Sequence, residues 1–125
     1  AIIIAPSNPI ISIGPILAIK SIRESLYNAK SKVIAISPIV GGMAIKGPAS
    51  EMMTDLGHES SALGIAKIYK PFLDSFVIDN TDSDLLESIN SLDIKTLTTN
   101  TIMDSLNNKI ALAQFVLKAL EMDQN

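Results

Sequence analysis

Cysteine is absent from this 125-residue sequence, and histidine occurs once, at His58. Without cysteine, the chain forms no disulfide, carries no thiolate nucleophile and offers no thiolate ligand to a metal. His58 lies in a Gly-His-Glu turn that is far in sequence from the polar loops described below, so we do not assign it as a catalytic base. These absences predict that the chain holds no Ser-His-Asp triad and no metal site of its own.

Basic clusters and long apolar runs are also missing from the sequence. The formal net charge is −3 and no basic run occurs, which argues against a surface for nucleic acid. No apolar run reaches the roughly 18 residues that a membrane-spanning helix needs, and no basic leader precedes the first apolar segment. We therefore expect a cytoplasmic protein with no nucleic-acid or membrane partner.

Most of the hydrophobic residues in this sequence are aliphatic, and few are aromatic. Hydrophobic residues make up 47% of the sequence and aromatic residues only 4%, so we expect a core of Ile, Leu, Val, Met and Ala. A chain of this length folds as one domain, 1–125. It starts without a methionine, directly in a strand-like segment, and we expect it to be the C-terminal part of a larger protein.

Strands and helices alternate along the whole sequence. Short β-branched segments predict strands at 2–4, 33–37, 76–78 and 94–97, with helical spacing between them and after the last. This alternation predicts an α/β fold, three-layered and Rossmann-like, with a mostly parallel sheet. We expect the second half of a larger doubly wound domain. Because removal of the other half exposes an apolar edge strand, we also expect a homo-oligomer.

Two of the predicted helices show a single apolar face. The first begins at Pro15, which suits the first helical position because its φ is fixed and no N–H donor is needed there. The apolar residues that fall on one face are Ile16, Ile19, Ile22 and Leu26 in that helix, and Ile110, Ala113, Leu117 and Leu120 in the C-terminal one.

Small polar residues interrupt the chain directly after the first strand. Ser7, Asn8 and Ser12 precede a helix start, and Gly14 leaves backbone amides accessible there. In open α/β sheets this loop lies at the carboxyl end of a strand, where ligands bind. Free N–H groups at a helix start favour an anionic ligand, and we expect this ligand to be a phosphate. Because the same residues are ordinary turn formers, a simple strand-to-helix turn is the alternative.

The loop after the second strand has a similar character. It offers Ser37, the pair Gly41 and Gly42, and Lys46, again just before a helix. Paired glycines let the backbone approach a ligand closely, and a lysine supplies a point charge for phosphate. The spacing is neither that of a Walker motif nor that of the Rossmann fingerprint. A flexible surface loop is the alternative, but two such loops after adjacent strands favour a shared phosphate site.

The loop after the third strand carries Asp79 and Asp82. Carboxylates at a strand end can bind a cation or accept hydrogen bonds from a ribose or a base. They are also common helix caps, and capping is the reading that we favour here. We keep both residues as candidates for polar contacts with a ligand.

The loops lie within long blocks of sequence that resemble the CofD-type 2-phospho-L-lactate transferases. The blocks occur in order and cover nearly the whole chain. They are APSNPIISIGPILAI at 5–19, VIAISPIVGGMAIKGPASEMM at 33–53, the segments IAKIY and FVIDNTD, and TIMDS at 101–105. The resemblance implies that the first interruption is the loop that holds substrate phosphates against a helix N-terminus.

The resemblance also implies a function. Members of this family move a phospholactyl group, or a phosphoenolpyruvyl group in some branches, from a guanosine-diphospho-activated donor to the deazaflavin alcohol FO. GMP leaves and a phosphodiester forms, with Mg²⁺ required, in the biosynthesis of a deazaflavin coenzyme. Family members are over twice as long as this chain. Their glycine-rich N-terminal motif and metal-binding aspartates lie in the part missing here, so we expect this chain alone to be inactive.

Two alternatives to a transferase remain open. A related branch of the superfamily resembles a non-catalytic nucleotide-sugar-binding regulatory protein, but its first loop reads more like PGSLYTSI. This sequence instead contains the segments PSNP and SIGPIL, which favour the transferase. The other alternative is a structural α/β domain that keeps no site.

Overall fold

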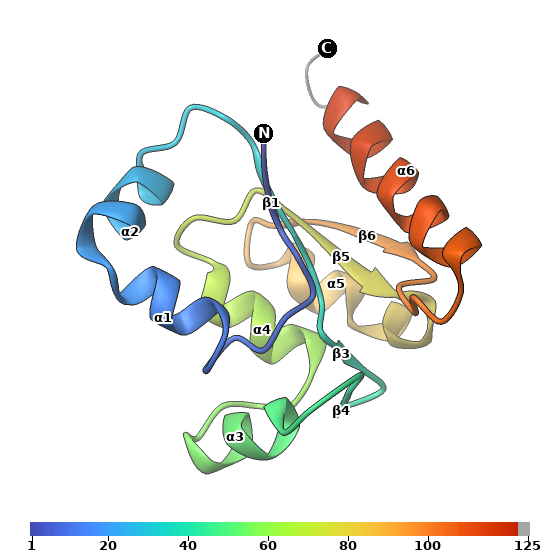
Figure 1. Ribbon diagram of the computed structural model, residues 1–125, viewed down its shortest axis with the longest axis horizontal. Coiled ribbons are helices and arrows are strands. Elements are labelled where there is room, and N and C mark those ends of the chain that lie inside the picture. Colours follow the sequence, from blue (N-terminus) through green and yellow to red (C-terminus); the bar gives the residue numbers. More distant parts are fainter. Residues whose placement is uncertain (123–125) are drawn as a thin grey trace.

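A computed structural model describes residues 1–122 and shows a four-stranded parallel sheet with helices on both faces (Figure 1). The α/β class and the parallel sheet predicted from the sequence are therefore confirmed. The strands of the sheet are β1 (Ile2–Ile4), β2 (Val33–Ile36), β5 (Ser75–Asp79) and β6 (Lys95–Thr99). The helices are α1 (Ile13–Ala18), α2 (Lys20–Tyr27), α3 (Ala49–Asp55), α4 (Ala62–Tyr69), the 3₁₀ helix η1 (Asn80–Leu85), α5 (Leu86–Asn90) and α6 (Leu106–Met122).

The strands follow one another across the sheet in chain order, β1-β2-β5-β6. The helices that connect them contribute to one apolar cluster on one face of the sheet, and α6 covers the other face (Figure 1). Sequential strand order with the connections on one face is the arrangement of one half of a doubly wound sheet. No helix within residues 1–122 is both long and apolar enough to cross a membrane.

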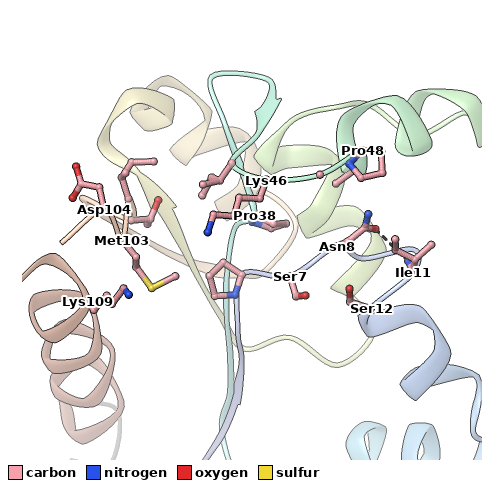
Figure 2. A pocket seen from close by; sticks show the side chains of 16 residues that line it. Ser7, Asn8, Ile11, Ser12, Pro38, Lys46, Pro48, Met103, Asp104 and Lys109 are labelled. Atoms are coloured by element: carbon pink, nitrogen blue, oxygen red, sulfur yellow. Dashed lines mark hydrogen bonds between the residues drawn. The ribbon is translucent and has the colours of Figure 1, made fainter. Parts of the chain in front are cut away.

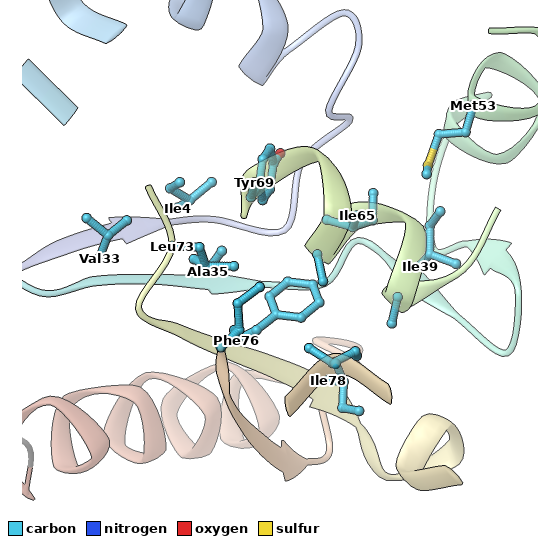
Figure 3. Close-up of a cluster of buried hydrophobic side chains, with 14 residues drawn as sticks. Ile4, Val33, Ala35, Ile39, Met53, Ile65, Tyr69, Leu73, Phe76 and Ile78 are labelled. Carbon is cyan, nitrogen blue, oxygen red and sulfur yellow. The ribbon is translucent and has the colours of Figure 1, made fainter. Parts of the chain in front are cut away.

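The two central strands, β2 and β5, are buried along their whole length. Because alternate side chains of a strand point to opposite faces, Phe76 and Ile78 pack under α4 while Val77 packs under α6. Figure 3 shows Phe76 and Ile78 gathered with Ile65 of α4 on the first face. The unbroken apolar sequence of β2 is typical of a parallel strand covered on both sides.

The predicted single helix from Pro15 is wrong, because the chain forms two helices there. They meet at Ile19, whose backbone is extended (ψ 111°), and α1 begins at Ile13 rather than at Pro15. Ile16, Ile19 and Ile22 are 48%, 51% and 42% exposed, so Leu26 is the one residue of the predicted apolar face that packs against the core. The break rotates α2 relative to α1, and the side chains that reach the core are Ile13, Leu17 and Leu26.

The predicted face of the C-terminal helix is also wrong, apart from Leu120. The residues of α6 that are buried against the sheet are Leu112, Val116, Ala119 and Leu120. Ile110 and Leu117, which the helical spacing placed on the apolar face, are 46% and 55% exposed. Because α6 is apolar on more than one side, helical periodicity cannot select the side that meets the sheet.

The glycine-rich loop after β2 contains a small hairpin that was not predicted. Its strands β3 (Ile39–Val40) and β4 (Met43–Ala44) pair in antiparallel fashion and enclose a two-residue turn. Gly41 and Gly42 occupy this turn with φ of 59° and 79°. Positive φ at both positions defines the hairpin turn that glycine accommodates best. The paired glycines therefore have a structural role in turning the chain.

Gly64 provides a test of the packing in α4. It is buried in the first turn of the helix, where its N–H donates to the Ser61 side chain (3.1 Å). A Cβ atom at this position would overlap the carbonyl oxygen of Glu59. We expect Gly64→Ala to lower the free energy of unfolding by about 1–3 kcal/mol through overpacking, although alanine is intrinsically favoured in helices by about 1 kcal/mol.

Urea unfolding would measure this change, with Ser21→Ala at an exposed position of α2 as the matched control. The control is expected to remain within about 0.5 kcal/mol of the wild type. If the Gly64→Ala chain is as stable as the wild type, the Glu59 carbonyl does not exclude a side chain at position 64.

Candidate functional site

A cavity of about 900 Å³ opens at the carboxyl ends of β1 and β2. This volume lies at the upper end of the range for small-molecule sites, and the carboxyl edge is where doubly wound sheets bind ligands. Four segments line the cavity (Figure 2). They are the loop after β1 (Pro6, Ser7, Asn8, Ile11 and Ser12), Pro38 after β2, the stretch 45–49 that leads into α3, and Thr101, Ile102, Met103, Asp104 and Lys109 after β6.

Asn8 shapes the first wall of the cavity. Its side-chain oxygen accepts hydrogen bonds from the backbone N–H groups of Ile10 (2.8 Å) and Ile11 (3.2 Å). Such a turn, in which an asparagine side chain binds the backbone two residues on, holds the loop in a compact form. Ser7 and Ser12 flank Asn8, and among residues 1–122 neither hydroxyl has a hydrogen-bond partner. Both hydroxyls are therefore available to a ligand in the cavity.

Lys46 lines a second wall of the cavity, after the β3–β4 hairpin. The hairpin is tied to the following helix because the Ala44 N–H donates to the Ser50 hydroxyl (2.6 Å). The Ser60 hydroxyl donates to the Gly42 carbonyl (3.0 Å), which holds the turn against the start of α4. Lys46 is exposed, and no carboxylate among the described residues lies within 4.0 Å of its Nζ.

Four of the residues predicted for a phosphate site meet in this cavity: Ser7, Asn8, Ser12 and Lys46. The others lie outside its lining. The Ser37 hydroxyl is fully buried and donates to the Ile39 carbonyl (2.8 Å), so it serves the local turn. Gly14 lies inside α1, where a Cβ would come within 3.0 Å of the Pro9 carbonyl oxygen.

Asp82 binds the backbone of the hairpin turn and does not line the cavity. Both of its carboxylate oxygens accept from the N–H of Gly41, at 3.0 and 3.1 Å. Burial raises the pKa of Asp82 above its ordinary value, and the negative charges of Asp79 and Asp84 raise it further. The Gly41 N–H opposes this effect. Gly41, Gly42 and Asp82 thus form one structural unit beside the cavity.

Asp79, at the end of β5, connects the sheet to the third wall of the cavity. One carboxylate oxygen accepts from the N–H (2.9 Å) and the hydroxyl (3.2 Å) of Thr101, and the other from the N–H of Thr81 (2.9 Å). Burial alone would raise the pKa of Asp79, but the hydrogen bonds from Thr101 and Thr81 outweigh it and lower the pKa below its ordinary value. Because Thr101 lines the cavity, Asp79 positions that wall from behind.

No group of three or more His, Asp or Glu side chains within residues 1–122 is arranged to hold a metal ion. Asp104 is the one acidic residue in the lining of the cavity.

Comparison with known proteins extends these observations. The family model for 2-phospho-L-lactate transferase CofD matches residues 1–116. The chain belongs to the CofD family. It is 44% identical to the 2-phospho-L-lactate transferase of Methanothermobacter thermautotrophicus over 116 residues, which are 93% of this chain and 37% of the relative.

Two further relatives carry the same name. The 2-phospho-L-lactate transferase of Methanocaldococcus jannaschii is 44% identical over 117 residues, and that of Methanosarcina mazei is 41% identical over 118 residues. Each match covers 94% of this chain but only 36% and 38% of the relative. The chain thus spans little more than a third of the length of these CofD proteins and matches their C-terminal part.

The sequence analysis missed the third wall of the cavity. The segment TIMDS supplied part of the resemblance to the CofD family, but none of its residues was assigned to a site. Nothing local marks it, because it follows an edge strand and carries neither glycine nor a lysine. Lys109 has the appearance of an ordinary exposed helical lysine. The position of these residues after β6 is set by long-range pairing of β5 with β6.

The Asp79–Thr101 connection generates a prediction about stability. Because the folded-state pKa of Asp79 is lowered, its ionised form stabilises the fold above the ordinary aspartate pKa of about 3.9. This contribution is lost as the pH falls through the lower folded-state value. We expect Asp79→Asn to lower the free energy of unfolding at about pH 7 by about 1–3 kcal/mol, with a smaller difference at about pH 2.5.

Urea unfolding at the two pH values would measure the effect, and Asp55→Asn in α3 is the control because no hydrogen bond or ion pair of its carboxylate is seen among the described residues. A difference between wild type and Asp79→Asn that does not change with pH would mean that the Asp79 charge has no part in holding Thr101.

Proposed function

We propose that this chain contributes to a transferase that moves a phospholactyl group, or a phosphoenolpyruvyl group, from a guanosine-diphospho-activated donor to the deazaflavin alcohol FO. GMP is the leaving group, and the product belongs to deazaflavin coenzyme biosynthesis. The observation that carries this proposal is the conjunction of the CofD family match with the cavity at the carboxyl ends of β1 and β2. The two long blocks that resemble the family supply the Ser7–Ser12 wall and Lys46 of that cavity.

The proposed reaction is a substitution at phosphorus. The primary alcohol of FO forms a bond to the phosphorus of the phospholactyl group while the bond from that phosphorus to the GMP oxygen breaks, and the alcohol proton is lost to solvent or a base. Reactions of this kind depend on alignment and on stabilisation of phosphate charge. Lys46 would supply positive charge, and the hydroxyls of Ser7 and Ser12 would donate hydrogen bonds to phosphate oxygens. No side-chain nucleophile is required.

Mg²⁺ belongs to the proposal through the resemblance to the family. When bound, it would offset charge on the donor phosphates. We place its ligands outside this chain, in the part of the relatives that the chain does not match, and we expect the chain alone to lack activity. We also propose that the protein is cytoplasmic.

Mass spectrometry of the reaction products would test the proposal. The complete gene product that carries this chain would be incubated with FO, lactyl-diphospho-guanosine and Mg²⁺. We expect the phospholactyl adduct of FO and GMP to appear together, and only in the presence of Mg²⁺. If neither product appears while a nucleotide sugar binds, the protein is a non-catalytic nucleotide-sugar-binding regulator and the transferase proposal is wrong.

Lys46→Met tests the assignment of Lys46 in the same protein. Removing one charge-assisted contact to a phosphate is expected to weaken donor binding by about 10- to 150-fold, because such a contact is worth about 1.5–3 kcal/mol. Isothermal titration with the donor would measure the dissociation constant. Lys30→Met, an exposed lysine outside the cavity lining, is the control and should bind as the wild type does. Unchanged affinity in Lys46→Met would remove Lys46 from the site.

We also propose that this chain forms homo-oligomers through β1. This strand lies at an edge of the sheet, where unpaired N–H and C=O groups can pair with a second copy, and Ile3 is 47% exposed. Sedimentation velocity is expected to show association that Ile3→Lys reduces. Ile16→Lys, at a similarly exposed position of α1 (48%), should leave the association unchanged. A chain that remains monomeric at high concentration would refute this proposal.

A further inference from the structure

Two lysines from separate elements line the same cavity. Lys46 follows the β3–β4 hairpin. Lys109 lies in the first turn of α6, 63 residues further along the chain. Figure 2 shows both side chains extending from different walls toward the space between them, with the carboxylate of Asp104 directed away from that space. The sequence analysis assigned only Lys46 to a site.

Neither lysine is neutralised by the protein. The ion pairs described for residues 1–122 include Lys20–Glu24, Lys32–Asp74 and Lys67–Glu59, but no carboxylate lies within 4.0 Å of the Nζ of Lys46 or Lys109. Asp104 does not pair with Lys109, since its carboxylate instead accepts a hydrogen bond from the side-chain amide of Asn108 (2.5 Å). Two unpaired ammonium groups therefore share one cavity in a chain whose net charge is −3.

The backbone that carries Lys109 is held in place. Its N–H donates to the Ser105 carbonyl (3.1 Å), and the Asn108 N–H donates to the Ser105 hydroxyl (3.1 Å), which caps the helix. Further along α6, Leu112 and Val116 are buried against the sheet. The preceding wall is held at Thr101 by Asp79. Lys109 is thus presented to the cavity by a packed helix and not by a free loop.

We propose that Lys109 binds the diphosphate of a nucleoside-diphosphate donor from the wall opposite Lys46. This inference rests on the proposed function and adds a second cationic contact to it. Two ammonium groups that share a cavity of about 900 Å³ repel one another, and an anion between them removes that repulsion. A diphosphate carries negative charge along its length and contacts both walls at once, whereas a single phosphate group satisfies fewer of these contacts.

Isothermal titration with inorganic pyrophosphate and with inorganic phosphate would test this inference in the complete gene product. We expect the wild type to bind pyrophosphate more tightly than phosphate. Lys109→Met should weaken pyrophosphate binding about tenfold and reduce the preference for pyrophosphate. Lys109→Arg, which keeps the charge, should retain most of the affinity. Lys118→Met, an exposed lysine of the same helix outside the cavity lining, should bind as the wild type does.

The possible outcomes separate this inference from the proposed function. If Lys46→Met weakens pyrophosphate binding and Lys109→Met does not, Lys109 is outside the site although the anion site stands. An equal loss in Lys118→Met would reveal a general charge effect and overturn the inference, as would a wild type that does not bind pyrophosphate. If Lys109→Met loses affinity but the product assay shows no transfer to FO, Lys109 binds diphosphate in a protein that is not this transferase.

Discussion

Burial of the two central strands on both faces is the constraint on which the rest of the structure depends. Every residue of β2 and of β5 is buried, so helices must cover the sheet on each side. The connecting helices cover one face and α6 covers the other. Because parallel strands all end at the same edge, this arrangement brings the loops after β1, β2 and β6 together around one cavity. The site is a consequence of how the sheet is covered.

Hydrogen bonds accepted by two buried carboxylates, one at the end of β5 and one in η1, give the cavity walls their form. Asp79 holds Thr101 behind one wall, and Asp82 holds the N–H of Gly41 in the hairpin that precedes Lys46. These two aspartates are buried and satisfied by backbone donors, so they contribute to the site by positioning it. The side chains left for a ligand are the hydroxyls of Ser7 and Ser12 and the two lysines. This division of roles is consistent with chemistry that depends on alignment and charge.

Membership of the CofD family accounts for the long blocks of sequence around the cavity. The chain spans little more than a third of the length of the relatives that it matches. Its described residues form a cationic, hydroxyl-lined cavity at the carboxyl edge of a parallel sheet.

Local pattern by itself determined the α/β class, the four strands of the sheet and the candidate loops after β1 and β2, because β-branched runs and turn formers act over a few residues. It did not determine which side of a helix is buried. Both Ile110 and Leu112 fit an apolar stripe of α6, and only contact with Ile34 and Val77 of the sheet selects Leu112. Tertiary structure also decided that Lys109 joins Lys46, since no local signal relates residues that meet only when β6 pairs with β5.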